Sequence, residues 1–135
     1  MGETKRVSLR WQDGLRFVGG APDGPVSMVD GDNTTAPGPM LTLLLAAASC
    51  SGSDVVLILK KMRVQLRDLR IDVTGERREQ EPRRYTAIHF DYHVAGEGLD
   101  QTRAERAVSL SVEKYCSVIH SLASDLAVTY AVTVG

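Results

Sequence analysis

The chain has 135 residues, of which 43% are apolar and 24% are charged, values typical of an ordinary globular protein. The length fits a single domain over residues 1–135, and the composition excludes a disordered or fibrous chain. The 16 Lys and Arg residues against 17 Asp and Glu residues leave a net charge of −1, which supplies no basic field to attract nucleic acid.

The first segments predict a three-stranded N-terminal meander. Val7–Trp11 alternates apolar with polar side chains, and Asp13-Gly14 follows as a hairpin turn. Two further short strands, at Leu15–Gly19 and Val26–Val29, are separated by a turn rich in Pro and Gly. Asp30–Gly38 contains almost nothing apolar, so we expect it to be an exposed loop.

One helical period covers Pro39 to about Arg67, where apolar residues recur every three or four positions. The N-terminal half is apolar nearly all round, which predicts burial on every side. Small polar residues at 49–53 are weak helix formers, so the helix either breaks there or continues. If continuous, it is about 40 Å long, more than a monomer of this size easily encloses. We therefore expect a partner subunit to cover the remainder.

The rest of the chain predicts two central strands, a helix and a closing strand. Alternation marks the strands at Leu69–Thr74 and Tyr85–Val94, and the second strand has one clearly apolar face. Asp100 can cap a helix that extends past Leu110, and Leu126–Val134 alternates again as a closing strand. The predicted order is βββ-α-ββ-α-β, an α+β fold with a long buried central helix.

The N-terminal residues lack the apolar core of a signal peptide. Thr42 and Ser49 interrupt the longest apolar stretch, which falls short of the roughly 18 uninterrupted residues of a membrane span. Two cysteines are too few for a disulfide scaffold, and a reducing cytoplasm would not keep a structural disulfide closed. We expect a cytoplasmic protein without membrane contact.

Cys50 lies between small polar residues, and Asp54 follows one helical turn later on the same face. It would be a reactive thiol if a helical segment began at the serine patch, because unpaired N–H groups and the helix dipole favour the thiolate. The alternative is a buried structural cysteine, a common place for a free cysteine. Asp54 favours that alternative, since a nearby carboxylate disfavours a thiolate.

Cys116 follows Glu113-Lys114-Tyr115 near the end of the second helical segment, and His120 lies one turn beyond it. It could act as a resolving thiol that condenses with an oxidised Cys50 by way of a sulfenic acid. The spacing of 66 positions does not show whether the Cα atoms approach within the about 7 Å that a disulfide requires.

His89, Asp91 and His93 alternate along one face of a predicted strand and could ligate a divalent metal. A solvated polar face is the simpler interpretation, because the opposite face of this strand is the apolar one. We therefore expect no metal site. A Cys–His protease is also rejected, since no pattern around Cys50 matches a protease nucleophile motif.

Three segments are specific in combination: Gly38-Pro39-Met40 leading into the helix of Cys50, then Asp54–Arg63, and finally Leu110–Cys116. Together they resemble the OsmC/Ohr family of small bacterial thiol proteins associated with osmotic and organic-peroxide stress, and more closely its general OsmC-like branch. The match runs nearly from end to end.

The resemblance implies an intertwined homodimer in which two sheets wrap around paired central helices, with a site at each subunit interface. In the family's peroxidases, the helix cysteine attacks the hydroperoxide, a second cysteine resolves the sulfenic acid, and a dithiol such as lipoamide restores both. Cys50 would be the peroxidatic and Cys116 the resolving cysteine, with Arg16, Asp54 and Glu113 as supporting residues. We expect no cofactor.

Two positions differ from the family's peroxidases, which pair a Glu after the helix-starting Pro with an Arg before the third strand. Met40 and Pro25 occupy these positions here, and Arg16 is the nearest alternative cation. Without a cation beside it, Cys50 would have less thiolate and react more slowly. Our main hypothesis is a thiol-dependent reductase of organic hydroperoxides in the oxidative stress response. The alternatives are a non-enzymatic dimeric module that binds a small apolar or electrophilic ligand, and cysteines that serve only in packing.

Overall fold

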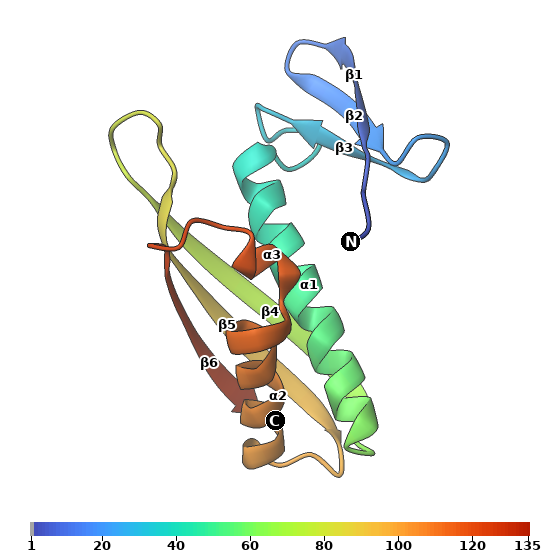
Figure 1. The fold of residues 1–135 in the computed structure, drawn as a ribbon, viewed down its shortest axis with the longest axis vertical. Coiled ribbons are helices and arrows are strands. Elements are labelled where there is room, and N and C mark those ends of the chain that lie inside the picture. Colours follow the sequence, from blue (N-terminus) through green and yellow to red (C-terminus); the bar gives the residue numbers. More distant parts are fainter. Residues whose placement is uncertain (1) are drawn as a thin grey trace. The chain divides into compact units, whose positions relative to one another are not determined.

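The computed structural model describes residues 2–135 and divides the chain between Leu43 and Leu44 into two compact units, which are treated separately below (Figure 1). The elements follow the order three strands, helix, two strands, helix and strand, which confirms the predicted α+β arrangement. A π-helical turn and a short third helix follow the second helix, and the sequence pattern indicated neither of them.

The N-terminal unit contains an antiparallel meander of β1 (Ser8–Asp13), β2 (Arg16–Gly20) and β3 (Val26–Asp30), in the order β1-β2-β3. Gly14 makes the predicted hairpin turn with a φ of +47°, a left-handed conformation that is easy for a residue without a side chain. The indole N–H of Trp11 donates to the carbonyl of Gly14 at 2.9 Å. The three predicted strands are therefore confirmed.

Residues 31–35 and 37 are exposed as expected, but Asp30 is buried, which corrects the expectation for the first residue of this loop. It ends β3 and is 1% exposed. Its carboxylate accepts hydrogen bonds of 2.8 to 3.2 Å from the backbone N–H groups of Asp32, Thr34 and Thr35 and from both threonine hydroxyls. These bonds hold the pKa of Asp30 well below its usual range, because they favour the ionised form. The polar residues of this loop therefore supply hydrogen-bond donors to the Asp30 carboxylate.

The central helix α1 (Pro39–Lys61) is continuous, so the serine patch at 49–53 does not break it. At 1.5 Å per residue its 23 residues extend over about 35 Å. By length and hydropathy it is the one helix among residues 2–135 that could cross a membrane. Core helices of globular domains share these properties, and one side of α1, including Val55 and Leu59, is buried.

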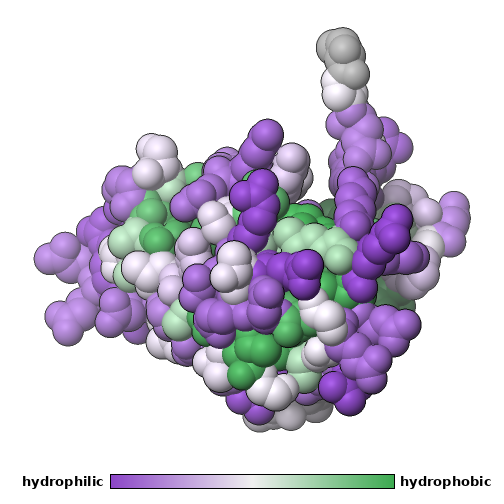
Figure 2. All heavy atoms as spheres, turned by 90° about the horizontal axis from the view of Figure 1, so that it is seen from below, coloured by the Kyte–Doolittle hydropathy of each residue, from purple (hydrophilic) through white to green (hydrophobic). Residues whose placement is uncertain are grey.

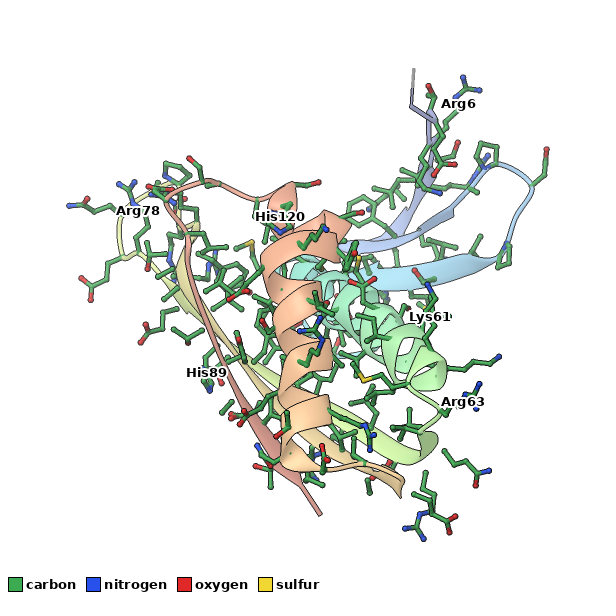
Figure 3. All side chains as sticks on the ribbon, turned by 60° about the horizontal axis from the view of Figure 1, so that its bottom comes forward. Arg6, Lys61, Arg63, Arg78, His89 and His120 are labelled. Atoms are coloured by element: carbon green, nitrogen blue, oxygen red, sulfur yellow. The ribbon has the colours of Figure 1, made fainter. Side chains whose placement is uncertain are left out.

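The helix ends earlier than its apolar period predicted. Arg63 adopts a φ of +63°, and the N–H of Val64 donates to the carbonyl of Leu59 at 3.0 Å, a pattern typical of a helix C-terminus. Lys61 and Arg63 extend from this end (Figure 3). Leu66 therefore belongs to the following strand, because its apolar side chain continues a period of two rather than the helical period.

A second three-stranded sheet, in the order β4-β5-β6, forms the base of the C-terminal unit. β4 (Gln65–Arg77) pairs antiparallel with β5 (Tyr85–Glu97), and β6 (Ala127–Val134) pairs parallel with β5. The parallel pair needs a crossover, which α2 (Gln101–Leu110) supplies. Both α1 and α2 cover the same face of this sheet (Figure 1).

The predicted buried face of β5 is confirmed, since Ile88, Phe90, Tyr92 and Val94 are at most 2% exposed. The rings of Phe90 and Tyr92 are stacked with centroids 6.1 Å apart. Tyr92 is the one member of this group with a polar tip, and a buried phenol needs a hydrogen-bond partner.

Asp100 caps α2 as predicted, because its carboxylate accepts a hydrogen bond of 2.7 Å from the N–H of Arg103. The helix continues directly into the π-helical turn η1 (Ser111–Tyr115). The short helix α3 (Ser117–His120) follows, and Cys116 lies between the two.

Large apolar side chains remain exposed in each unit, and Figure 2 shows apolar surface between hydrophilic side chains. They include Leu9, Trp11, Val26 and Met28 in the N-terminal unit and Leu45, Val56, Leu57 and Tyr115 in the C-terminal unit. Exposed apolar surface on this scale is typical of an interaction site.

Candidate active site

The two cysteines lie close together in the fold although 66 positions separate them in the sequence. Cys50 lies on α1 and is half-buried, whereas Cys116 follows η1 and is 0% exposed. The Cys50 side chain lies close enough to the Cys116 sulfur to raise its pKa, and that sulfur is 4.0 Å from the carbonyl oxygen of Ala47, one helical turn before Cys50 on α1. Both are free thiols, so the arrangement brings one accessible and one buried sulfur into contact.

Cys116 is held from several sides. Its sulfur accepts a hydrogen bond of 3.5 Å from the N–H of Ile119 and lies 4.0 Å from the carbonyl oxygen of Ala47 on α1. Burial raises the pKa of the Cys116 thiol to about 11, and the contact with Cys50 acts in the same direction. Cys116 is therefore a protonated thiol at neutral pH.

The turn before Cys116 is wider than an α-helical turn. The N–H of Cys116 donates to the carbonyl of Ser111, five residues earlier, at 2.8 Å. Such π-helical turns are rare overall, but many of those that occur lie at functional sites. The extra residue in the turn changes the direction of the side chains that follow. Ser111 begins the turn on the buried face of α2, and the turn directs the Cys116 thiol toward α1, where both side chains have hydrogen-bond partners.

A buried chain of hydroxyl groups lies beside the cysteines. The Ser51 hydroxyl lies 2.6 Å from the Tyr92 hydroxyl and 2.8 Å from the Ser111 hydroxyl. Ser111 in turn donates to a carboxylate oxygen of Asp54 at 2.9 Å. The chain therefore joins β5, α1 and η1 through side chains alone.

The acceptor at one end gives this chain a direction. A carboxylate only accepts hydrogen bonds, so Ser111 donates to Asp54, Ser51 donates to Ser111, and Tyr92 donates to Ser51. Burial raises the pKa of Tyr92 to about 12, and the nearby Cys116 and Asp54 add to this shift. The Tyr92 hydroxyl therefore stays protonated at neutral pH and acts as the donor to Ser51.

The predicted supporting residues have different surroundings. Asp54 is half-buried and belongs to the hydroxyl chain. Glu113 is exposed on η1, where its carboxylate accepts a hydrogen bond of 3.0 Å from Ser109. Arg16 lies on β2 of the N-terminal unit and pairs with Asp13 at 2.6 Å, so its action on Cys50 stays a prediction.

Ser51, Ser111 and Tyr92 were not identified as site residues from the sequence. A signal for Ser51 was present, because it shares the buried stripe of α1 with Ala47 and Val55 and is the polar member of that stripe. A similar signal was present for Ser111, which continues the buried stripe of α2 after Ala107 and Val108 and is its polar member.

The histidines of β5 lie on the other face of the sheet, and Figure 3 shows His89 on the side away from α2. His89 contacts Asp91 at 3.2 Å, and His93 contacts Asp72 on β4 at 3.5 Å. Among residues 2–135, no group of three or more His, Cys, Asp or Glu side chains is arranged to hold a metal ion.

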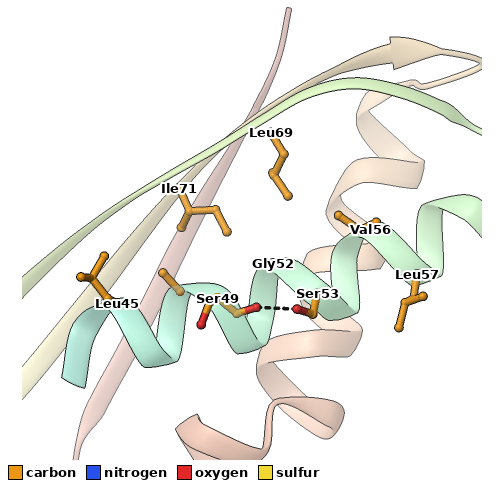
Figure 4. A pocket seen from close by; sticks show the side chains of 9 residues that line it. Leu45, Ser49, Gly52, Ser53, Val56, Leu57, Leu69 and Ile71 are labelled. Carbon is orange, nitrogen blue, oxygen red and sulfur yellow. Dashed lines mark hydrogen bonds between the residues drawn. The ribbon is translucent and has the colours of Figure 1, made fainter. Parts of the chain in front are cut away.

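An apolar groove of about 700 Å³ runs between α1 and β4 (Figure 4). Leu45, Gly52 and Val56 line it from the helix, and Leu69 and Ile71 line it from the strand. Cys50 and Gly52 are two positions apart, which corresponds to a rotation of about 200° around the helix axis. Cys50 therefore points away from the side of α1 on which Gly52 lines the groove. The groove and the pair of thiols are therefore separate features.

The model of the OsmC-like protein family matches residues 31–131. The chain is 40% identical over 127 residues to protein YhfA of Escherichia coli, a match that covers 93% of this chain and 95% of YhfA. Among solved structures, a hypothetical protein from Aquifex aeolicus matches with a TM-score of 0.84 and 33% identity over 99% of each chain.

The organic hydroperoxide resistance protein OhrB of Bacillus subtilis has the same fold, with a TM-score of 0.64 at 18% identity over 97% of this chain and 98% of OhrB. The matched segment includes both cysteines and the whole hydroxyl chain between Ser51 and Ser111. On the extent of these matches, the chain belongs to the OsmC-like protein family.

Proposed function

We propose that the protein is a thiol-dependent reductase of organic hydroperoxides that acts in the response to peroxide stress. Cys50 is the peroxidatic cysteine and Cys116 is the resolving cysteine. The observation that carries this proposal is the contact between the two thiols, which the fold brings together from α1 and from the end of η1.

The unequal burial of the cysteines supports these roles. A peroxidatic thiol must meet substrate, and Cys50 is the more exposed of the two. A resolving thiol needs only to reach the first cysteine, and Cys116 is fully buried against it. The fold shared with OhrB, named as an organic hydroperoxide resistance protein, agrees with this assignment.

The proposed cycle has three balanced steps. The Cys50 sulfur attacks the O–O bond of ROOH, which gives Cys50 sulfenic acid and, with the thiol proton, the alcohol ROH. The Cys116 sulfur then attacks the Cys50 sulfur, and its thiol proton leaves with the hydroxide as water. A dithiol of the lipoamide type reduces the resulting disulfide and is itself oxidised to a disulfide. No cofactor or metal is required.

The proposal includes a cytoplasmic homodimer. The exposed apolar residues of both units and the groove beside α1 support it, because a partner subunit would remove this surface from water. Leu57→Asp should lower the dimer fraction in size-exclusion chromatography with light scattering, whereas Gln80→Asp in the exposed β4–β5 loop should not. A wild-type monomer at all concentrations would contradict this part of the proposal.

The enzymatic proposal is tested by turnover of cumene hydroperoxide with dihydrolipoamide. Cys50→Ser should abolish turnover, and Cys116→Ser should allow one oxidation per site and then stop. Hydrogen peroxide serves as the comparison substrate, and we expect it to react more slowly. Turnover that survives Cys50→Ser would disprove the assignment.

The groove favours a second candidate, a non-enzymatic module that binds a small apolar or electrophilic molecule. Its volume falls within the range of about 300 to 1,000 Å³ that is usual for ligand pockets. Cumyl alcohol would serve as the probe. Ala48 also lines the groove from α1, so Ala48→Leu would narrow it. Thermal stabilisation by the probe that Ala48→Leu removes, without peroxide turnover, would favour this candidate over the reductase.

A further inference from the structure

We propose that Ser111 and Asp54 are positioning residues that hold Cys116 in place for its reaction with oxidised Cys50. This inference rests on the thiol chemistry proposed above and deepens it. It concerns the second step of the cycle, in which the disulfide closes, rather than the attack on peroxide.

Ser111 makes contacts in two directions. Its carbonyl accepts the N–H of Cys116 at 2.8 Å, so it controls the backbone that carries the buried thiol. Its hydroxyl donates to Asp54 at 2.9 Å and lies 2.8 Å from the Ser51 hydroxyl. One residue thus connects the segment of Cys116 to α1.

The two anchors on α1 lie on either side of the chemistry. Ser51 follows Cys50 directly, and Asp54 lies one helical turn beyond Cys50 on the same face. Tyr92 holds Ser51 from β5 with a hydrogen bond of 2.6 Å, and both of these side chains are fully buried. The position of Cys116 relative to Cys50 therefore depends on hydrogen bonds to the sheet as well as to the helix.

Such anchoring matters because η1 is a π-helical turn, and a π-helical turn is less stable than an α-helical one. A return of Ser111–Tyr115 to α-helical spacing would rotate Cys116 by up to about 100° around the helix axis. That rotation would move its sulfur away from Cys50. The side-chain bonds of Ser111 oppose this change because they fix the residue that begins the wide turn and whose carbonyl accepts the N–H of Cys116.

The geometry has a direct effect on the rate of closure. The Cys116 sulfur must approach the Cys50 sulfur along the S–O axis of the sulfenic acid as water leaves. A displacement of about 1 Å can slow a reaction between two held groups by about a hundredfold. Attack of Cys50 on peroxide does not involve Cys116, so the same displacement leaves the first step unchanged.

The test measures the two steps separately in the full-length protein. Trapping with dimedone gives the rate of Cys50 oxidation by cumene hydroperoxide, and quenched samples analysed by intact mass give the rate of disulfide closure. Ser111→Ala and Asp54→Ala should slow closure at least about tenfold. Ser111→Ala should change the first rate by less than about twofold, and Asp54→Ala should not lower it, because a carboxylate near Cys50 disfavours the thiolate. Ser109→Ala is the matched control, because it removes a hydroxyl near η1 that bonds only at the surface.

A conservative variant distinguishes positioning from a general loss of stability. Asp54→Asn keeps an oxygen that can accept from Ser111, so it should retain most of the closure rate that Asp54→Ala loses. Should Ser111→Ala fail to fold, the pair of Asp54 variants carries the test alone. Equal closure rates for Asp54→Ala and the wild type would overturn the inference.

A second oxidant separates this inference from the proposed function. Diamide adds one thiol across its N=N bond, and the second thiol displaces the hydrazine to form the disulfide. If peroxide leaves Cys50 unoxidised but diamide closes the disulfide more slowly in Asp54→Ala than in the wild type, the reductase proposal fails and the positioning role stands. Equal closure by diamide in both proteins would overturn the positioning role whatever peroxide does.

Discussion

The hydroxyl groups of Tyr92 and Ser51 lie 2.6 Å apart in the interior of the C-terminal unit and join β5 to α1. Tyr92→Phe keeps the stacked ring and removes this bond. We expect a loss of about 1 kcal/mol in the free energy of unfolding, because Ser51 keeps Ser111 as a partner. Urea unfolding at pH 7 checks this value. Tyr115→Phe, at an exposed position, should have no measurable effect.

The contribution of Tyr92 should depend on pH in the alkaline range. Burial raises its pKa to about 12, above the value of about 10 in an unfolded chain. The stabilisation is therefore complete below pH 10 and is lost as the pH rises from 10 toward 12. The difference in unfolding free energy between the wild type and Tyr92→Phe should narrow between pH 10 and pH 12. A constant difference would contradict the raised pKa.

Disulfide closure should accelerate with pH. Burial raises the pKa of Cys116 to about 11, so only a small fraction of its sulfur is thiolate at pH 7. Since the thiolate is the attacking species, the closure rate should rise by about tenfold per pH unit between pH 7 and pH 9. Rapid-quench mass analysis after oxidation with a stoichiometric amount of peroxide measures this rate. A plateau that begins below pH 8 would show that Cys116 ionises more readily than its burial predicts.

Asp30→Asn should destabilise the loop between β3 and α1. The amide of Asn has one oxygen in place of two, and its N–H groups would face the donors of Thr34 and Thr35. Because the pKa of Asp30 is lowered by these bonds, its contribution is present above about pH 4 and decreases as the pH falls further. Thermal unfolding at pH 7 and pH 3 should therefore show a smaller difference from wild type at pH 3. Asp32→Asn is the control, since Asp32 contributes its backbone N–H.

Gly75 on β4 lies directly against the ring of Tyr85. A methyl group on Gly75 would lie 2.5 Å from Cε1 and 2.7 Å from Cδ1 of that ring. A buried ring cannot yield without disturbing its neighbours, so Gly75→Ala should lower the free energy of unfolding by about 1 to 3 kcal/mol. Gly135→Ala, where nothing lies within 4 Å of the added atom, provides the control for denaturant unfolding.

Local sequence patterns predicted the helices and strands of this fold well, because each pattern depends only on which side of a single helix or strand is buried. Alternation along β5 identified Ile88, Phe90 and Val94 as buried, since a strand repeats every two residues. Asp100 was identified as a helix cap because the side chain of a capping residue acts on N–H groups only two or three positions away.

The errors arose where a local pattern had two possible continuations. The apolar period of α1 continued through Leu66, and only the left-handed conformation of Arg63 shows that the helix ends before it. Asp30 was assigned to an exposed loop by composition, although its carboxylate organises that loop from within. The backbone conformation of one residue decided the first case and the hydrogen bonds of one side chain decided the second, and composition encodes neither.

The sequence by itself determined the order of elements, the buried face of the central strand and the resemblance to the family, and it identified the two cysteines as candidate reactive groups. Only the tertiary structure decided that Cys50 and Cys116 touch, and that Ser51, Tyr92 and Ser111 form one chain of hydroxyls ending at Asp54. The physical reason is that these contacts join residues 41 to 66 positions apart, on elements whose packing and π-helical turn no local period records.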